Sequence, residues 1–206
     1  MNPAPEEIAA IHRQVSDDVA KVAGEVRTLL TTPSNWSGRV RVAGQRQLRG
    51  MGIYFPNGDI GIAAEILDEP HRYWPAVICE TIHAHSPGNV HRSFVFAIYP
   101  GLEEGLNEKL QRLLRPRILR RLGVQVDEQA LLHRDENHAF NRFVDALEAI
   151  RVAAGPQAAD PLDFYQRMLE QPIDDRIAWL MSLSRHPDAF PGFDRVFAAN
   201  LGLLRD

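Results

Sequence analysis

The chain has 206 residues, of which 45% are hydrophobic and 24% charged, and a formal net charge of -4. These values are typical of a globular protein with one sizeable core, and they argue against a nucleic-acid binder, whose domains are usually strongly basic. With no apolar run of about 18 residues, no secretory signal pattern and a single cysteine, Cys79, we expect a cytoplasmic protein without a membrane span or an intramolecular disulfide.

Residues 1–32 are predicted to form an N-terminal helix. Pro5 suits a first helical turn, and the acidic residues after it suit the positive end of the helix dipole. Apolar residues then recur in steps of three and four, at Ile8, Ile11, Val15, Val19, Val22, Val26 and Leu29. The stripe ends at the breaker cluster 31–34, so we expect a helix that packs along one face.

Strand patterns follow between residues 38 and 67. Residues 38–42 alternate apolar and polar side chains, and two further runs cover 51–55 and 60–67. The last two runs are separated by Pro-Asn-Gly-Asp at 56–59, which is a turn signal. The pattern predicts a β-hairpin within a small mixed sheet.

Helical patterns dominate the rest of the chain. Helices are predicted over 73–85, 102–122 (with a break at Pro116), and 136–154, and two or three shorter ones over 160–205. An apolar run at 94–99 has no assigned element. Strands followed by helices indicate an α+β fold.

The segment from Val77 to Ser86, VICETIHAHS, carries the most informative pattern. Cys79 and His83 are four residues apart on the predicted helix, so they share one face and can bind one metal ion. Glu80, next to Cys79, takes the position of a general base. The pattern resembles the H-E-x-x-H motif of zincin metallopeptidases, with cysteine in place of the first histidine ligand.

The flanking sequence extends this resemblance over residues 38–122. Residues 59–65, DIGIAAE, resemble the strand that runs along the substrate cleft of zincins. Residues 102–108, LEEGLNE, resemble the downstream helix of gluzincin-type peptidases, which supplies the third ligand. The resemblance implies that Glu104 is this ligand and that Glu108 orients His83 or the ligand helix. Glu103 is an alternative for either role.

The implied architecture is a single zincin-like domain spanning residues 1–206. A sheet and metal-site core at 38–122 follows the N-terminal helix, and residues 136–206 form a mainly helical C-terminal part. The implied cofactor is Zn2+.

Cys79 changes the expected chemistry of this site. Zinc binds thiolate at about 2.3 Å and imidazole at about 2.0 Å, so Cys79, His83 and Glu104 can hold the ion with one position open. Two anionic ligands leave less positive charge on the ion, which weakens it as a Lewis acid. His85 replaces the missing ligand in a second interpretation, which requires the helix to end near Ala84.

The sequence therefore predicts zinc-dependent hydrolysis of a peptide or protein substrate, weakened by the cysteine. The alternative is an inactive pseudo-peptidase that binds a peptide or protein, with the cleft strand pairing to an extended chain. Each residue also has a structural interpretation: Cys79 as a small buried side chain, and Glu103 and Glu104 as complements to a helix dipole.

Other interpretations have weaker support. A nucleophilic Cys79 with His83 as its base would place a reactive thiol inside a helix, although such thiols prefer helix N-termini. A cupin-like site at His83, His85 and His91 lacks the many strands of that fold. The arginines at 112, 115, 117, 120 and 121 read as a solvated face. A zincin often has a histidine or tyrosine that stabilises the tetrahedral oxyanion, and the sequence does not select among His133, His138 and Tyr165 for this role.

Overall fold

A computed structural model describes residues 4–88 and 93–205. Helices and a three-stranded sheet make up the described part, so the predicted α+β class is confirmed. Contacts divide the chain into two compact units, residues 1–85 with 114–134 and residues 86–113 with 135–206. The single-domain organisation expected from the sequence stays a prediction.

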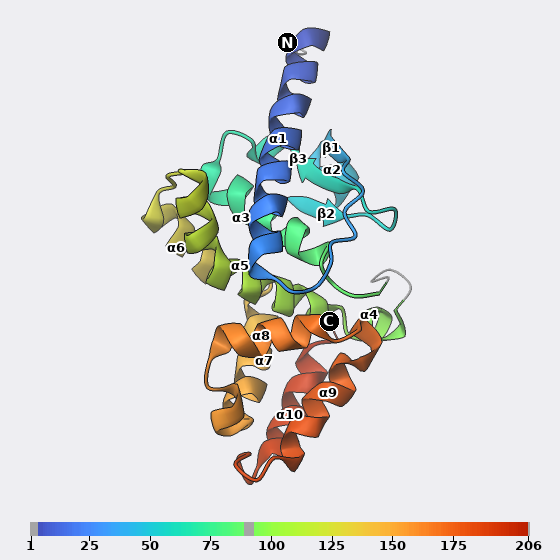
Figure 1. Ribbon diagram of the computed structural model, residues 1–206, viewed down its shortest axis with the longest axis vertical. Coiled ribbons are helices and arrows are strands. Elements are labelled where there is room, and N and C mark those ends of the chain that lie inside the picture. Colours follow the sequence, from blue (N-terminus) through green and yellow to red (C-terminus); the bar gives the residue numbers. More distant parts are fainter. Residues whose placement is uncertain (1–3, 89–92, 206) are drawn as a thin grey trace. The chain divides into compact units, whose positions relative to one another are not determined.

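The first unit contains the sheet, two long helices and several shorter elements. Its elements are α1 (Pro5–Leu29), β1 (Val40–Ala43), α2 (Gln45–Leu48), β2 (Gly52–Tyr54), β3 (Ile60–Ala63), a 3-10 turn (Ala64–Ile66) and α3 (Pro70–His83). The last turns of α5 (Pro100–Leu122) and most of α6 (Glu128–Glu136) complete it. Figure 1 labels these elements.

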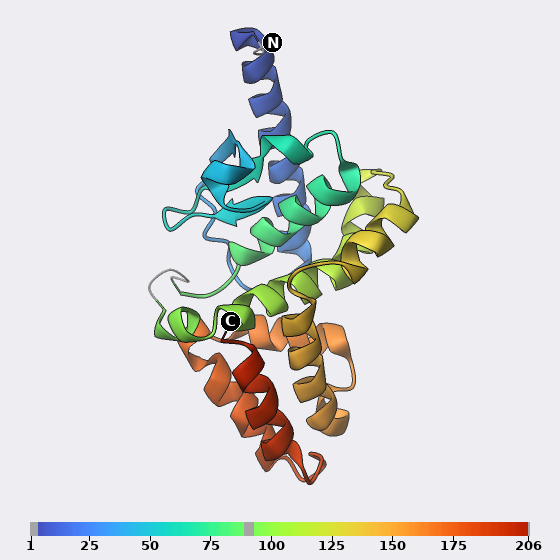
Figure 2. The ribbon, with the colours of Figure 1, turned by 180° about the vertical axis from the view of Figure 1, so that it is seen from behind.

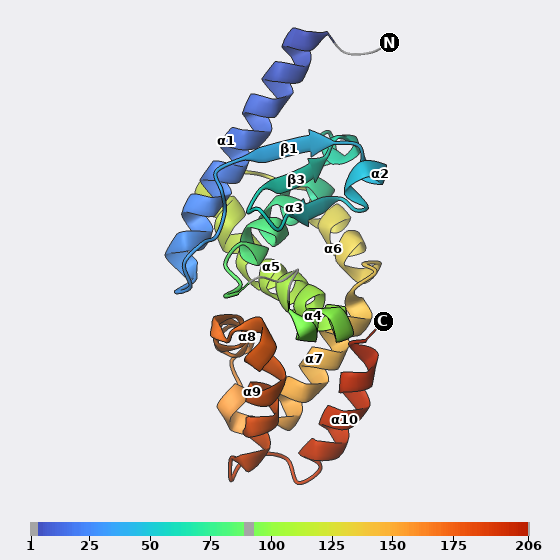
Figure 3. The ribbon, with the colours of Figure 1, turned by 90° about the vertical axis from the view of Figure 1, so that its right-hand side faces the viewer.

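The two long helices of this unit pack on each other and on the sheet. The predicted stripe of α1 is buried from Val15 to Val26, whereas Ile8 remains 43% exposed. α3 contacts α1, β2 and β3, and Figure 3 shows it beneath the strands. Every residue of α3 from Pro75 to His83 is buried, so the chemical groups of this helix lie inside the unit.

The sheet has the strand order β1-β3-β2. β1 pairs with β3 in parallel, Val40 opposite Ile60, and β2 pairs with β3 in antiparallel, Gly52 opposite Ile62. The predicted hairpin at 56–59 is thereby confirmed. The cleft-strand interpretation of residues 59–65 is wrong, because β3 is hydrogen-bonded on both sides and offers no free edge. β2 is an outer strand of this sheet.

The strand expected over 60–67 is shorter than its apolar run. It ends at Ala63, and the chain turns through a 3-10 helix in which the amide of Leu67 donates to the carbonyl of Ala64. The carboxylate of Glu65 in this turn accepts from the amide of Gln45, at 2.8 and 3.0 Å. This side-chain contact replaces the strand ladder beyond Ala63.

The helix expected over 136–154 is confirmed as a single element that begins five residues later, at Asn141, and a further helix that was not expected precedes it. The structure has α6 at 128–136 and α7 (Asn141–Ala153). The carboxylate of Asp127 accepts from the amides of Gln129 and Ala130 and caps the start of α6. The Asn141 amide donates to the carbonyls of Asp135 and Glu136 at its end.

The break expected at Pro116 does not occur. α5 continues through this residue to Leu122, although proline removes one backbone hydrogen bond from the helix.

The second unit is helical in its described part. Its elements are α4 (Phe94–Ile98), the first turns of α5, α7, α8 (Pro161–Glu170), α9 (Arg176–Ser182) and α10 (Phe193–Leu203), with 3-10 turns at Gly155–Ala158, Ile173–Asp175 and Leu183–Arg185. The short helices expected over 160–205 are confirmed. α7 and α10 lie side by side (Figure 2). The apolar run at 94–99 forms α4, whose first turn is capped by the hydroxyl of Ser93.

Candidate functional site

The three residues of the predicted motif lie on α3 and are almost inaccessible. The exposed fractions of Cys79, Glu80 and His83 are 9%, 8% and 7%. Pro70 and Pro75 do not prevent the helix from running to His83, and Cys79 and His83 share one face by their four-residue spacing. A carboxyl and an imidazole in such surroundings require polar or charged neighbours to be stable there.

Glu80 lies against the backbone of β2. A Cβ atom placed on Gly52 would come within 2.7 Å of Glu80 Cγ and 2.8 Å of its Oε1. These separations are shorter than any ordinary contact, so the Glu80 side chain occupies the space that a side chain at position 52 would need. The carboxylate of the motif helix is therefore next to an outer strand of the sheet.

His83 interacts electrostatically with Tyr54, which lies on β2, the strand that also contains Gly52. Burial raises the pKa of the Tyr54 phenol, and the nearby His83 lowers it by a smaller amount. The phenol donates a hydrogen bond to the carbonyl of Asn35, at 3.1 Å. Gly52 and Tyr54 are two residues apart and point to the same face of β2. The motif helix therefore contacts this strand through Glu80, His83, Gly52 and Tyr54. We call these four residues the α3–β2 face.

The thiol and imidazole of the motif are donors that zinc accepts. Cys79 is buried, and together with His83 it would give one sulfur and one nitrogen ligand on one helical face. Within residues 4–88 and 93–205, no group of three or more His, Cys, Asp or Glu side chains is arranged to hold a metal ion. The pair fits the donor chemistry of zinc, and the third ligand stays a prediction.

His85 has different neighbours from His83. Its Nδ1 lies 2.6 Å from the carbonyl oxygen of Thr32, beyond the end of α1, and its ring is fully buried. Burial lowers the pKa of His85, and the Thr32 carbonyl opposes this shift. Its Nε2 has no hydrogen-bond partner among the described residues. α3 ends at His83, as the second ligand interpretation requires, but the two imidazoles have contacts with different segments.

Glu103, in the second unit, is part of a buried hydrogen-bond cluster. Its Oε1 accepts from the hydroxyl of Ser86 at 2.5 Å and from the amide of Asn107 at 2.9 Å. Its Oε2 pairs with the guanidinium of Arg176. The side chain of Glu103 is 1% exposed. These partners give its carboxylate a clear structural role, and its alternative role at the metal stays a prediction.

Glu108 also has partners within the second unit. Arg112 Nε donates to its Oε1 at 2.7 Å, and His138 Nε2 lies 3.8 Å from its Oε2. Tyr165, by contrast, donates to the carboxylate of Glu148 at 3.0 Å. His138, one of the unassigned set, thus lies beside an acidic residue of α5. The proposed orienting role of Glu108, and the ligand role of Glu104, are not decided by these contacts.

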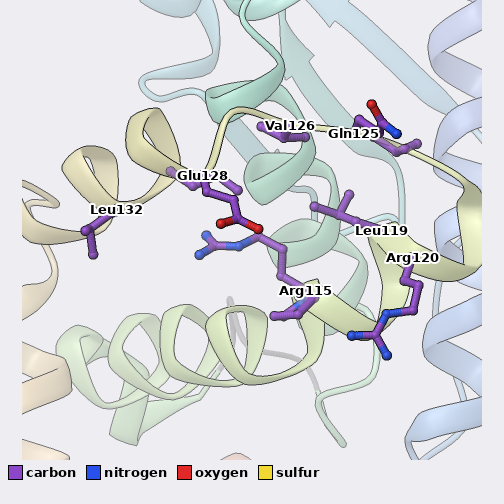
Figure 4. Close-up of a pocket in the computed structure, with 10 residues that line it drawn as sticks. Arg115, Leu119, Arg120, Gln125, Val126, Glu128 and Leu132 are labelled. Atoms are coloured by element: carbon purple, nitrogen blue, oxygen red, sulfur yellow. The ribbon is translucent and has the colours of Figure 1, made fainter.

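A cavity of about 640 Å³ lies in the first unit, between the end of α5 and α6. Figure 4 shows Arg115 and Glu128 pointing toward one another across it, while Arg120 points away. The remaining lining is mainly apolar and comes from Pro116, Leu119, Val124, Val126, Leu131 and Leu132, with Gln125. Sequence reasoning missed this cavity, because its lining comes from two helices and the segment that joins them.

The predicted arginine face on α5 is divided among different environments. Arg112 pairs with Glu108, and Arg121 donates to Glu25 and Thr28 of α1. Arg115 is buried. Arg117 and Arg120 are exposed. The run is therefore not one uniform anion-binding face.

Comparison of the chain with protein-family models, with curated proteins and with solved structures found no match. Among the helices of the described residues, none combines the length and the apolar character needed to cross a membrane. The function is therefore inferred from the residues of the α3–β2 face and from the motif in the sequence.

Proposed function

We propose that this chain is a zincin-like metallopeptidase that hydrolyses peptide bonds with zinc. The observation that carries the proposal is the position of Glu80, a buried carboxylate held beside an outer strand by the helix that also carries Cys79 and His83. Motif spacing alone would place these groups on any helix. The position of Glu80 against β2 supports the proposal, because an outer strand is the kind that can receive an extended chain.

Each residue then has a defined task. Cys79 and His83 would hold the ion. Bound zinc supplies a Lewis acid that polarises water and the scissile carbonyl. Glu80 accepts the proton of the attacking water on its carboxylate and returns it to the leaving amine. The outer strand β2 orients the substrate by main-chain hydrogen bonds.

A non-catalytic peptide-binding protein with the same fold is the second candidate. The observation that favours it is Cys79 at the first ligand position, because a thiolate leaves less positive charge on the ion than imidazole does. This candidate keeps the pairing of a peptide with β2 and omits the proton transfers at Glu80.

Metal content measured by elemental mass spectrometry tests the proposal. The tag-free protein, incubated with zinc and then desalted, is expected to retain stoichiometric zinc, and Cys79→Ser/His83→Ala to lose it. His186→Ala removes an exposed histidine, 40% exposed at its side chain, and serves as the control that keeps zinc. Absence of zinc from the unaltered protein would overturn the metallopeptidase and leave the peptide-binding candidate.

Hydrolysis of a mixed peptide library tests the role of Glu80. Glu80→Gln keeps the shape of the side chain and removes the basic carboxylate, so it should retain zinc and lose turnover by about a hundredfold or more. Glu69→Gln, at the start of the same helix and 38% exposed, is the control that keeps turnover. Equal turnover in Glu80→Gln and the unaltered protein would eliminate Glu80 as the base.

A further inference from the structure

We infer that Gly52 is a positioning residue for Glu80, and that the missing side chain at position 52 creates the place in which the Glu80 carboxylate works. This inference rests on the proposed function for its catalytic consequence. The contact between the two residues is independent of that function and can be tested without it.

The backbone of Gly52 does not itself demand glycine. The positive-φ glycines of the described chain are Gly38, Gly58, Gly88, Gly123 and Gly155, and Gly52 is not among them. It lies in strand β2 opposite Ile62. Glycine inside a strand weakens it, and often marks a point at which another group approaches the backbone closely. The reason for glycine at position 52 must therefore be sought in its surroundings.

The nearest group in those surroundings is the Glu80 side chain. The three heavy atoms nearest to a Cβ at position 52 are Glu80 Cγ at 2.7 Å, Oε1 at 2.8 Å and Cδ at 3.1 Å. At Gly61, in the neighbouring strand, the corresponding atoms belong to the apolar side chains of Ile53, Phe55 and Leu48. Gly61 thus makes room for apolar packing, whereas Gly52 makes room for one carboxylate.

A methyl group at position 52 would move the carboxylate more readily than the backbone. Gly52 is fixed by pairing with β3, and the backbone of α3 is fixed by its contacts with α1 and the sheet. The Glu80 side chain is the part that can rotate. Gly52→Ala should therefore leave the fold intact and displace the group that the proposed mechanism needs at a defined position, where small misplacements have large effects on rate.

Carboxyl-detected NMR of the metal-free protein tests the contact directly. Gly52→Ala is expected to change the chemical shift of the Glu80 carboxyl and to leave that of Glu25 unchanged. Gly24→Ala is the matched control, because no atom lies within 4 Å of a Cβ at that position of α1. An unchanged Glu80 signal in Gly52→Ala would overturn the inference.

A double-mutant cycle keeps the test valid if Gly52→Ala folds poorly. Glu80→Ala removes all three atoms that the new methyl group would meet, so Gly52→Ala should lower the thermal midpoint only when Glu80 is present. Equal losses in the Glu80 and Glu80→Ala backgrounds would show that position 52 acts through the strand and not through Glu80.

Turnover separates this inference from the proposed function. With zinc content retained, Gly52→Ala should lower kcat by about tenfold or more and change KM little. An active Glu80→Gln variant would refute the proposed function and leave the NMR result standing. An inactive Glu80→Gln variant together with a fully active Gly52→Ala variant would refute the positioning role alone.

Discussion

Arg176 and Glu103 form an ion pair in the second unit whose side chains are 0% and 1% exposed. Arg176 also donates to the Ser86 hydroxyl at 3.3 Å and to the Leu169 and Gln171 carbonyls, each at 3.2 Å. Burial lowers the pKa of Arg176, and the adjacent carboxylate favours the charged guanidinium. The first turns of α5 are thereby connected to α9 and to the C-terminal end of α8.

Removal of one partner of this pair should strongly destabilise the second unit. Glu103→Ala leaves the guanidinium buried without its carboxylate, and we expect a loss of about 3–5 kcal/mol in the free energy of unfolding. Urea unfolding followed by circular dichroism measures this loss.

Asp163→Ala provides the comparison for Glu103→Ala. It removes the i,i+4 pair with Arg167, 2.9 Å long, whose side chains are 59% and 38% exposed. An exposed pair of this kind contributes less than about 1 kcal/mol. If Glu103→Ala cost no more stability than Asp163→Ala, the buried pair would not have the structural role assigned to it.

Asp59 makes the stability of the first unit depend on acidic pH. Hydrogen bonds from the Ser37 hydroxyl, the largest cause, and from Arg41, Arg39 and Asn57 hold its pKa well below the ordinary value of 3.8, against the opposing effect of burial. A carboxyl with a lowered pKa in the folded state stabilises it above the unfolded pKa, and this contribution is lost as pH falls below that value.

The Asp59→Asn variant should therefore be less stable than the unaltered protein at neutral pH and lose less stability on acidification. Urea midpoints measured between about pH 6 and pH 3 test this difference in slope. Asp68→Asn, on the loop before α3, is the control that should keep the slope of the unaltered protein. Parallel curves for Asp59→Asn and the unaltered protein would contradict the assigned role.

Local signals in the sequence predicted much of the first unit. The apolar spacing of α1 and the Asn57-Gly58 turn each depend on a few neighbouring residues, and both elements were predicted correctly. The central position of β3 depends on its parallel pairing with β1, across a connection that includes α2 and β2. No local pattern encodes such an order, and the edge interpretation of residues 59–65 failed for this reason.

In the candidate site, too, the sequence predicts what depends on local spacing and does not predict what depends on the fold. The spacing of Cys79, Glu80 and His83 predicts that they share a helix, which the structure has. Their neighbours Gly52 and Tyr54 belong to strand β2, which is distant from α3 in the sequence. Only the fold brings this strand to the helix. A glycine interrupting an apolar strand run is a signal of close approach, but it does not reveal which group approaches.

Tyr73 and Asp18 connect α3 to α1 and give a prediction at alkaline pH. The Tyr73 phenol donates to the Asp18 carboxylate at 3.1 Å, and its side chain is buried. Burial, with Asp18 adding to its effect, raises the pKa of Tyr73 above the ordinary value of 10.0. The folded state keeps this phenol neutral, so stability should fall as pH rises above the unfolded pKa.

Tyr73→Phe should cost about 1–2 kcal/mol at neutral pH, because the Asp18 carboxylate loses a buried donor. Its stability should also fall less steeply between about pH 9 and pH 11. Thermal unfolding at these pH values measures both effects, with the partly exposed Tyr99→Phe as the control. A steeper alkaline loss in Tyr73→Phe would contradict the explanation.

Replacement of Cys79 by histidine tests the unusual ligand of the proposed site. Histidine would restore the H-E-x-x-H pattern with a neutral ligand, and the ion would keep more of its positive charge. Cys79→His should therefore raise hydrolysis above that of the unaltered protein, with zinc affinity at least maintained in a chelator competition. Cys79→Ser, similar in size to cysteine but a weaker ligand, should lower zinc affinity. Circular dichroism checks that the larger side chain fits at this buried position. If Cys79→His folds normally but binds zinc more weakly, then Cys79 does not occupy the position of the histidine ligand, and the resemblance to zincins loses its main support.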